Sequence, residues 1–256
     1  MHGITRAALP ALLAGHRPVG HVIDCIGLTG DFRDRPLDTA EAHVGLVARC
    51  LAELRFDSFL LLSSTRVYTR AFATHERALL AADPSAPSDL YNVTKLAGEA
   101  LCLADPRPGV RVARLSNVYG IGMPATSFLG DVLREGHETG QVTFRQGATS
   151  AKDYISVAAV VRILPAIAAA ARHRLYNVAT GRNIEHAAIA RCLRDSAGWR
   201  TSFAADAPTV RHRPIDTARL EAEFGGAPGD LVADLPGMLA LAEDDRCSPS
   251  TKRMAA

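Results

Sequence analysis

The sequence predicts an α/β protein built on a doubly wound parallel sheet. Short apolar runs that end in small or polar residues alternate with segments whose apolar residues recur at helical spacing. This is the pattern of strands covered by helices. The chain has 256 residues, 48% of them hydrophobic, which is enough for one large core or two small ones. Ligands of such sheets bind at the carboxyl ends of the strands, so the residues there are the first candidates for a site.

The first predicted elements are a strand over residues 21–28 and the helix that follows it. The strand is mostly apolar and ends near a glycine, as a buried parallel strand does. Asp38 or Thr39 is predicted to cap the helix. The apolar residues of this helix recur every three or four positions, at Val44, Val47, Leu51 and Leu54.

A second buried strand is predicted over residues 59–62, followed by the polar run 63–65. A loop rich in Pro, Ser and Asp covers residues 83–88. Ser88 at its end is predicted to cap a helix over 89–103. Two further apolar strands are predicted at 110–115 and 175–178.

The composition excludes several classes of protein. A net charge of +2, from 29 basic and 27 acidic residues, argues against a dedicated nucleic-acid or membrane-surface binder. No apolar run approaches the roughly 18 residues that a membrane span needs. Pro10 interrupts the short apolar stretch 7–14, and no cleavage site follows it. We therefore expect no signal peptide and a cytoplasmic protein.

The cysteines and histidines predict neither a disulfide framework nor a metal site. Five cysteines are scattered without a C-x-x-C pair, which fits a reducing compartment. The nine histidines show no H-E-x-x-H spacing. The cysteines are Cys25, Cys50, Cys102, Cys192 and Cys247.

Lysine is rare in this chain, with only Lys95, Lys152 and Lys252 among the 29 basic residues. An ammonium is a compact charge with a tunable pKa, whereas a guanidinium is a planar fork. A lysine retained in an arginine-rich chain therefore indicates a position where the fork does not serve. Lys252 lies in the polar tail, which leaves Lys95 and Lys152 as candidates.

Tyr91 and Lys95 lie four residues apart, on one face of the predicted helix. A free tyrosine has a pKa of about 10, and a nearby cation lowers it by favouring the phenolate. Ser64, at the end of the preceding strand, could offer its hydroxyl to the same substrate oxygen. Taken alone, the Y-x-x-x-K spacing is also typical of an exposed helical pair.

Five segments in order carry a family resemblance. Ser-Ser-Thr-Arg-Val-Tyr at 63–68 precedes the proline-containing loop, and Tyr-x-x-x-Lys-x-x-x-Glu follows at 91–99. Arg-x-x-Asn-Val-Tyr-Gly spans 114–120, Lys-Asp-Tyr-Ile spans 152–155, and Tyr-Asn-Val-Ala-Thr-Gly spans 176–181. Together they resemble the extended short-chain dehydrogenase/reductases, the NAD-dependent epimerase/dehydratase family of nucleotide-sugar enzymes.

The resemblance implies catalytic roles for three residues. Tyr91 is expected to be the acid/base, and Lys95 its partner and a ligand of the cofactor ribose. Ser64 is expected to orient the substrate hydroxyl. The implied activity is that of an NAD(P)-dependent epimerase, dehydratase or reductase, an isomerase or oxidoreductase acting on a sugar nucleotide or a related compound.

The resemblance also implies binding residues. Ile26 and Gly27 fall where the family lines the cofactor cleft, together with Tyr91 and Lys95. Ser64, Thr65 and Asn117 fall where the family contacts substrate. Lys152 replaces an arginine that some members use near a substrate phosphate. A point charge cannot reproduce the bidentate contact of a fork, and a solvated lysine at a strand start is the alternative.

The family's Gly-rich turn, G-x-x-G-x-x-G, does not precede residue 21. That turn holds the cofactor pyrophosphate at a helix N-terminus. We therefore expect an N-terminally truncated Rossmann-like core that binds NAD or NADP weakly and self-associates through a free strand edge. The G-x-G-x-x-A pattern at 120–125 is interpreted as part of a substrate loop, because no acidic partner strand follows it.

Two other interpretations of the function remain. One is a binding or regulatory protein of the same fold that lacks the cofactor, and the other is an inactive fragment from a misassigned start. The expected partner is a small-molecule substrate, and no interpretation involves a nucleic acid or a membrane. The resemblance also implies pairing with a second copy of the chain. In such a homodimer the helices at 39–54 and 89–103 would form the contact.

The expected domain organisation follows from the same segments. Residues 1–181 are expected to form the Rossmann-like core, with 121–150 contributing to a substrate lobe. Residues 182–243 are expected to form that smaller C-terminal substrate-binding lobe, and the polar residues 244–256 a disordered tail.

Overall fold

The computed structural model describes residues 2–15, 17–28 and 30–247. Its strands are β1 (Val19–Asp24), β2 (Phe56–Ser64), β3 (Val110–Leu115), β4 (Asn117–Tyr119), β5 (Gln141–Phe144), β6 (Ala151–Ser156), β7 (Leu175–Val178), β8 (Asn183–Glu185) and β9 (Arg200–Phe203). Its α-helices are α1 (Leu9–Ala14), α2 (Pro36–Ala40), α3 (Leu46–Glu53), α4 (Leu90–Ala104), α5 (Phe128–Thr139), α6 (Val157–Ala170), α7 (His186–Ala197), α8 (Ala218–Phe224) and α9 (Leu231–Cys247). Shorter turns of helix are η1 (Arg6–Ala8), the π-helical η2 (Glu41–Gly45), η3 (Thr65–Tyr68) and η4 (Pro87–Asp89).

The chain divides into two compact units. The first comprises residues 1–116, 160–179 and 215–227, and the second comprises residues 117–159, 180–214 and 228–256. This division differs from the expected domains, because 215–227 return to the first unit and 151–159 belong to the second. The return has a physical reason: Ile215 packs with Val67, Tyr68 and Ala179 in one buried cluster.

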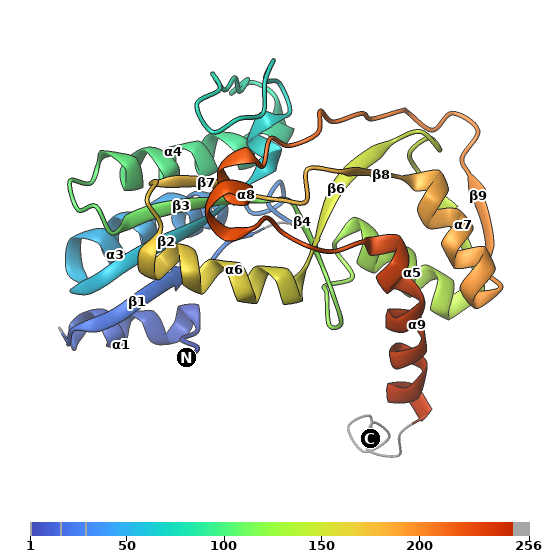
Figure 1. The fold of residues 1–256 in the computed structure, drawn as a ribbon, viewed down its shortest axis with the longest axis horizontal. Coiled ribbons are helices and arrows are strands. Elements are labelled where there is room, and N and C mark those ends of the chain that lie inside the picture. The colour runs from blue at the N-terminus through green and yellow to red at the C-terminus, as the bar shows by residue number, and fades with distance from the viewer. Residues whose placement is uncertain (1, 16, 29, 248–256) are drawn as a thin grey trace. The chain divides into compact units, whose positions relative to one another are not determined.

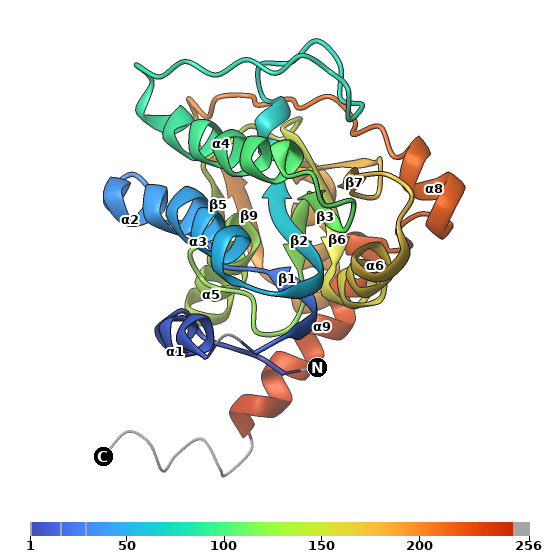
Figure 2. The same ribbon diagram turned by 90° about the vertical axis from the view of Figure 1, so that its left-hand side faces the viewer.

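The first unit contains a four-stranded parallel sheet in the order β1-β2-β3-β7, which confirms the predicted α/β class (Figure 1). Helices α3 and α4 lie on one face of this sheet, and the part of α6 within this unit lies on the other (Figure 2). Among the described residues, β1 pairs with β2 alone. The self-association expected from that edge stays a prediction.

Alternation along the strands builds the core of this unit. Phe59 and Leu61 point to the same face of β2 because successive side chains alternate, and both are almost completely buried. They pack with apolar residues of α1, α3, α4, β3 and β7. That cluster comprises Leu9, Leu13, Leu46, Val47, Cys50, Leu54, Phe59, Leu61, Cys102, Val110, Val112 and Leu175.

The first strand and its helix differ from the prediction at their ends. β1 ends at Asp24, so the last four residues of the predicted strand form a loop. The helical segment begins at Pro36 rather than after Asp38, because proline suits the first turn of a helix. It then passes through the π-helical turn η2 into α3. Such turns are frequent at functional sites, and this one carries His43.

The start of α4 also differs. Asp89, not Ser88, occupies the position before the first helical residue. The backbone carbonyl of Ser88 accepts a hydrogen bond from Arg66 Nη2 at 3.0 Å. The predicted Ser88 cap is therefore wrong, and Asp89 makes no side-chain capping hydrogen bond in its place, while the helix itself is confirmed.

The second unit has two small sheets, β4-β6-β8 and the pair β5-β9. Helices α5, α7 and α9 contribute side chains to its core. Those core residues are Tyr119, Leu129, Val132, Val142, Phe144, Tyr154, Ile189, Ala190, Cys192, Leu193, Trp199, Leu231, Leu235 and Leu239. Helix α9 continues to Cys247, into the region expected to be a disordered tail. Residues 248–256 of that tail lie outside the described residues.

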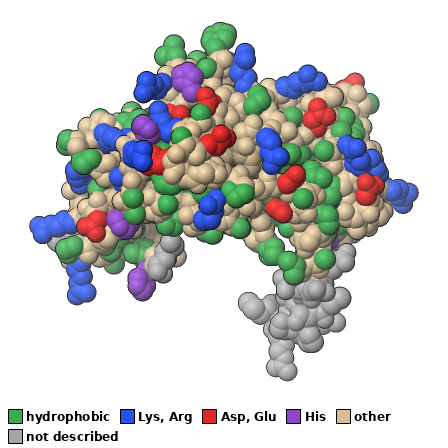
Figure 3. Space-filling view, in the orientation of Figure 1, with side chains coloured by type: hydrophobic (Ala, Val, Ile, Leu, Met, Phe, Trp, Pro, Cys, Tyr) green, Lys and Arg blue, Asp and Glu red, His purple; other side chains and the backbone are tan. Residues whose placement is uncertain are grey.

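No helix of the described chain is both long and apolar enough to span a membrane. Within the same residues, no group of three or more His, Cys, Asp or Glu side chains is arranged to hold a metal ion. On the face seen in Figure 3, acidic side chains lie among the basic ones. Cys25, Cys50, Cys102 and Cys192 are free thiols.

Candidate active site

Ser64 and Tyr91 meet at the carboxyl end of β2. Ser64 is the last residue of that strand, and Tyr91 lies in the first turn of α4 with 7% of its surface exposed. The Ser64 side chain lies close enough to the Tyr91 phenol to favour its phenolate form. Ser64 Oγ also accepts the backbone N–H of Arg66 at 3.2 Å, which fixes the hydroxyl at the end of the strand. The two predicted catalytic hydroxyls are therefore in contact.

The pKa of Tyr91 departs from the expectation. Burial raises the pKa of the Tyr91 phenol above its ordinary value, while the Ser64 side chain and the positive charge of Arg66 oppose this. The sequence argument assigned the lowering to Lys95. That residue's Nζ lies 5.9 Å from the Tyr91 ring centroid. In the structure Ser64 and Arg66, not Lys95, lower the pKa of Tyr91. Burial outweighs them, and the net shift of this pKa is upward.

Lys95 lies one turn further along α4, and only 5% of its surface is exposed. Its Nζ donates a hydrogen bond of 2.9 Å to the carbonyl of Leu62 in β2. Burial lowers the pKa of Lys95 to about 8, and the negative charges of Asp24 and Glu99 oppose that effect. The ammonium is therefore held charged at neutral pH in a desolvated position.

The loop after β1 faces Lys95. A Cβ atom at Gly27 would lie 3.3 Å from Lys95 Nζ and 3.2 Å from His43 Nε2, so a larger residue would crowd both groups. Asp24 Oδ1 accepts the backbone N–H of Ile26 at 2.9 Å. Its Oδ2 is buried and has no hydrogen-bond partner among the described residues. Burial raises the pKa of Asp24, opposed by the Ile26 N–H and Lys95.

His43 is a site residue that the sequence analysis missed. It is 1% exposed, and its Nε2 accepts the backbone N–H of Leu28 at 3.2 Å. Its Nδ1 lies 2.8 Å from Thr94 Oγ1, and its ring packs edge-on against Tyr91 at 5.2 Å. Burial and the charge of Lys95 lower the pKa of His43 to about 3. Neutral His43 thus joins the loop after β1 to helix α4.

Arg66 was also missed, although it lies inside a motif. Its guanidinium carbon is 5.4 Å from the centroid of the Tyr91 ring. The same guanidinium is 5.1 Å from the Phe32 ring, and the Phe32 and Tyr91 rings are 5.5 Å apart. A basic residue two positions after a strand-terminal serine is the only sequence signal for it.

Other motif residues form a buried hydrogen-bond network that links β2, α4 and β3. Arg114 forms hydrogen bonds with both carboxylate oxygens of Glu99, and the side chains of this ion pair are only 4% and 3% exposed. Ser63 Oγ donates to the same carboxylate at 2.5 Å. Because Glu99 lies on α4 and Ser63 on β2, this network fixes the helix that carries Tyr91 and Lys95 against the strand that carries Ser64.

The residues expected to bind substrate fall in different units. Thr65 is half-buried in the first unit, at the start of η3 next to Ser64. Asn117 and Lys152 belong to the second unit. There the Asn117 side chain donates to the Asp153 carbonyl at 2.8 Å. Lys152 Nζ lies 4.7 Å from the centroid of the Phe128 ring.

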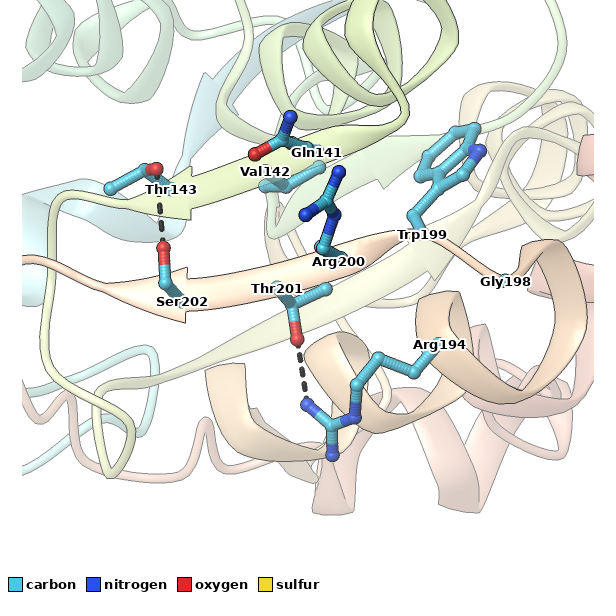
Figure 4. Close-up of a pocket in the computed structure, with 9 residues that line it drawn as sticks. All are labelled: Gln141, Val142, Thr143, Arg194, Gly198, Trp199, Arg200, Thr201 and Ser202. Atoms are coloured by element: carbon cyan, nitrogen blue, oxygen red, sulfur yellow. Dashed lines mark hydrogen bonds between the residues drawn. The ribbon is translucent and has the colours of Figure 1, made fainter.

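A surface hollow in the second unit contains none of the predicted site residues. Its side chains come from β5, β9 and the end of α7, and they bond to one another: Thr143 with Ser202, and Arg194 with Thr201 (Figure 4). No acid/base pair lies in it, so its chemistry offers less than the group of Ser64, Tyr91, Lys95, His43 and Arg66, called the Tyr91 cluster below. The residues that line it are Gln141, Val142, Thr143, Arg194, Gly198, Trp199, Arg200, Thr201 and Ser202.

Comparison with protein families matches residues 4–179 to the NAD dependent epimerase/dehydratase family. The matched segment contains every residue of the Tyr91 cluster. A comparison of the sequence with curated proteins gave no match.

Three solved structures with the same fold are named for NAD and for nucleotide sugars. MoeE5 in complex with UDP-glucose and NAD is 23% identical, with 90% of this chain and 80% of that chain covered and a TM-score of 0.73. UDP-glucuronic acid 4-epimerase from Bacillus cereus, in complex with UDP-glucuronic acid and NAD, is 18% identical, with 92% and 78% covered and a TM-score of 0.74. TunA, an NAD dependent NDP-hexosamine 5,6-dehydratase, is 18% identical, with 89% and 77% covered and a TM-score of 0.72. At these identities the likeness establishes the fold alone.

Proposed function

The chain belongs to the NAD dependent epimerase/dehydratase family, and on this premise we propose that it oxidises a hydroxyl carbon of a nucleotide-linked sugar, or reduces the matching carbonyl. The observation that carries the proposal is the buried contact of Ser64 with Tyr91, with Lys95 on the same helix face. The sugar-nucleotide class is supported by the ligands named for structures of the same fold, UDP-glucose and UDP-glucuronic acid.

In the oxidising direction the substrate loses the proton of its hydroxyl and the hydride of the carbon that bears it, and a carbonyl forms. Tyr91 takes the proton on its phenolate oxygen. Ser64 holds the reacting oxygen, because its hydroxyl already lies against the phenol. A positioned acid/base of this kind contributes about 100- to 10,000-fold in rate.

Burial raises the pKa of Tyr91, so the phenol can donate its proton in the reducing direction, and in the oxidising direction it must first release that proton to solvent before it accepts the substrate proton. Proton transfer therefore depends on the neighbours that favour the phenolate. Ser64 and Arg66 oppose the effect of burial, and Lys95 keeps a positive charge close to the ring. Ser64 and Arg66 therefore share the stabilisation of the developing negative charge.

The residues after β1 and on α4 fit the nicotinamide end of NAD or NADP. Gly27 leaves room beside Lys95 Nζ, and that ammonium has further N–H donors beyond its bond to Leu62. Asp24 adds, in the same region, a carboxylate oxygen that has no hydrogen-bond partner among the described residues. When bound, the cofactor would supply the hydride acceptor or donor. Ile26, Gly27, Tyr91 and Lys95 would hold it.

The alternative is a binding or regulatory protein of the same fold without hydride chemistry. The observation that favours it lies in the sequence: residues 1–18 contain glycine only at positions 3 and 15, so no Gly-rich turn for the pyrophosphate is found there. Calorimetry with NAD and with NADP tests this directly. Micromolar affinity would contradict the weak binding expected from the sequence and would remove the ground for the alternative.

The deciding experiment follows the absorbance of the reduced nicotinamide with UDP-glucose and with UDP-glucuronic acid. Tyr91→Phe is expected to reduce turnover at least about 100-fold, with the fold intact because only a hydroxyl is removed. Lys95→Arg is also expected to be damaging, since a guanidinium does not fit the position of a buried ammonium.

Tyr176→Phe is the matched control. Its hydroxyl is bonded to Glu223 and to the backbone of His173, away from the Tyr91 cluster, so its loss is expected to leave turnover unchanged. Wild-type turnover in Tyr91→Phe would show that the acid/base assignment is wrong.

A further inference from the structure

Arg66 lies beside Tyr91 and Arg33 lies near Arg66, and neither forms an ion pair with an acidic side chain among the described residues. Arg66 and Arg33 lie with their guanidinium carbons 5.1 Å and 4.6 Å from the centroid of one ring, that of Phe32. Phe32 is 1% exposed, so this ring is a fixed platform. Two like charges gathered on one aromatic side chain repel each other, unless an anion lies between or beside them.

The nearby carboxylates are already occupied by other arginines. Arg35 pairs with Asp31 at 3.1 Å and with Asp38 at 2.7 Å. Arg70 pairs with Asp89 at 2.8 Å, and Asp89 also accepts the backbone N–H of Asp83. Asp31, Asp38 and Asp89 therefore pair with other arginines, although the charge of Asp89 also acts on Arg66.

The surroundings of Arg66 disfavour its positive charge. It is half-buried, and burial together with the charge of Arg33 lowers the pKa of its guanidinium. The one hydrogen bond of its guanidinium among the described residues goes to a neutral carbonyl, that of Ser88. Most of its five N–H donors are thus left for another acceptor. A desolvated cation without a partner is costly, and a bound anion would remove that cost.

We propose that Arg66, assisted by Arg33, binds an anionic oxygen group of the substrate next to the reacting hydroxyl. This rests on the proposed function, because the substrate is taken to react at Tyr91. Arginine is suited to such a group, since its fork binds carboxylate or phosphate oxygens in a bidentate way. The 5.4 Å between the Arg66 guanidinium and the Tyr91 ring places the anion within one sugar residue of the acid/base.

Two parts of a nucleotide-linked sugar acid carry such oxygens: a carboxylate on the sugar ring and the diphosphate. UDP-glucuronic acid and UDP-glucose share the diphosphate and differ only in that carboxylate. Calorimetric titration of both compounds, in the presence of NAD, therefore separates the two sources. The variants are Arg66→Gln and Arg33→Gln, with Arg66→Lys to retain the charge without the fork.

Losing one charge-assisted contact is expected to weaken binding about 10- to 100-fold. A loss confined to UDP-glucuronic acid identifies the sugar carboxylate, and an equal loss for both compounds identifies the diphosphate. Arg66→Lys should retain part of the affinity. Arg35→Gln is the control, because Arg35 lies in the same segment but is paired on both sides, and it should bind both compounds as the wild type does.

Unchanged affinity for both compounds in Arg66→Gln and Arg33→Gln would overturn the inference, as would a loss of NAD affinity alone. Neither result would touch the proposed function, which stands or falls with the turnover of Tyr91→Phe. If the wild type binds neither compound, the substrate class is wrong and this inference fails with it. Arg33→Gln changes an exposed side chain, so the test does not depend on the folding of the half-buried Arg66 variants.

Discussion

Tyr68 donates a hydrogen bond of 2.8 Å to the side chain of Asn177, which lies 109 residues further along the chain. Arg114 in turn donates to the Tyr68 hydroxyl at 2.7 Å and bonds to Glu99. These four residues come from four separate motifs and form one buried network in the first unit. The motifs therefore contain two kinds of residue: those that hold helix α4 against the sheet, and those that lie around the hydroxyls of Ser64 and Tyr91.

The buried ion pair of Arg114 with Glu99 should contribute strongly to the stability of the protein. Arg114→Met leaves the Glu99 carboxylate buried without its cation, which costs about 3–5 kcal/mol of unfolding free energy. Urea denaturation measures it. Arg49→Met is the control, because the Arg49–Glu53 pair is 44% and 40% exposed and such pairs contribute less than about 1 kcal/mol. Similar losses in the two variants would refute a structural role for Arg114.

The charge of Asp24 should set the alkaline limit of activity. Burial lowers the pKa of Lys95 to about 8, and without the charge of Asp24 it would be lower still. The ammonium is lost as the pH rises through that value. In Asp24→Asn the pKa of Lys95 is expected to fall, and the alkaline limb of the kcat/KM profile should move below pH 8. Asp57→Asn, an exposed residue near the start of β2, should leave the limb in place. An unmoved limb in Asp24→Asn would mean that a group other than Lys95 produces it.

Buried His43 should make the protein sensitive to acid. Its folded-state pKa is about 3, below the unfolded value of about 6.5, so the unfolded state binds the proton first. Stability is then lost as the pH falls below about 6.5, by up to about 2 kcal/mol from this residue at pH 5. Urea midpoints between pH 7 and pH 5 should fall less steeply in His43→Asn than in the wild type. His75→Asn, at an exposed position, should keep the wild-type slope, and an identical slope in His43→Asn would contradict the assignment.

Lys152 should act on substrate binding rather than on the chemical step. If it contacts an anionic group, Lys152→Ala should raise KM more than it lowers kcat, and Lys152→Arg should recover part of the affinity. Arg145→Ala is a control in the same unit, since Arg145 is 76% exposed and paired with Asp131. Steady-state kinetics with both UDP-sugars decide this. An unchanged KM would favour the alternative interpretation, a solvated lysine at the start of β6.

The sequence was sufficient for the main sheet and for placing Tyr91 and Lys95 on one helix. Strands β3 and β7 have the predicted bounds, because a short apolar run between polar segments can be buried in few ways other than as a strand. The spacing of Tyr91 and Lys95 placed both on one helix face, and both are buried in α4. These are local properties, set by side-chain polarity and by the period of each element.

Only the tertiary structure decided the environment of those residues. It brought His43 to Tyr91 and Asp24 to Lys95, and it set Arg66 rather than Lys95 against the phenol. The pKa of a side chain depends on its burial and on charges a few ångströms away, and these are contributed by residues distant in the sequence. Composition and spacing therefore determined which groups could do the chemistry, while the packing of remote segments determined the protonation states in which they are held.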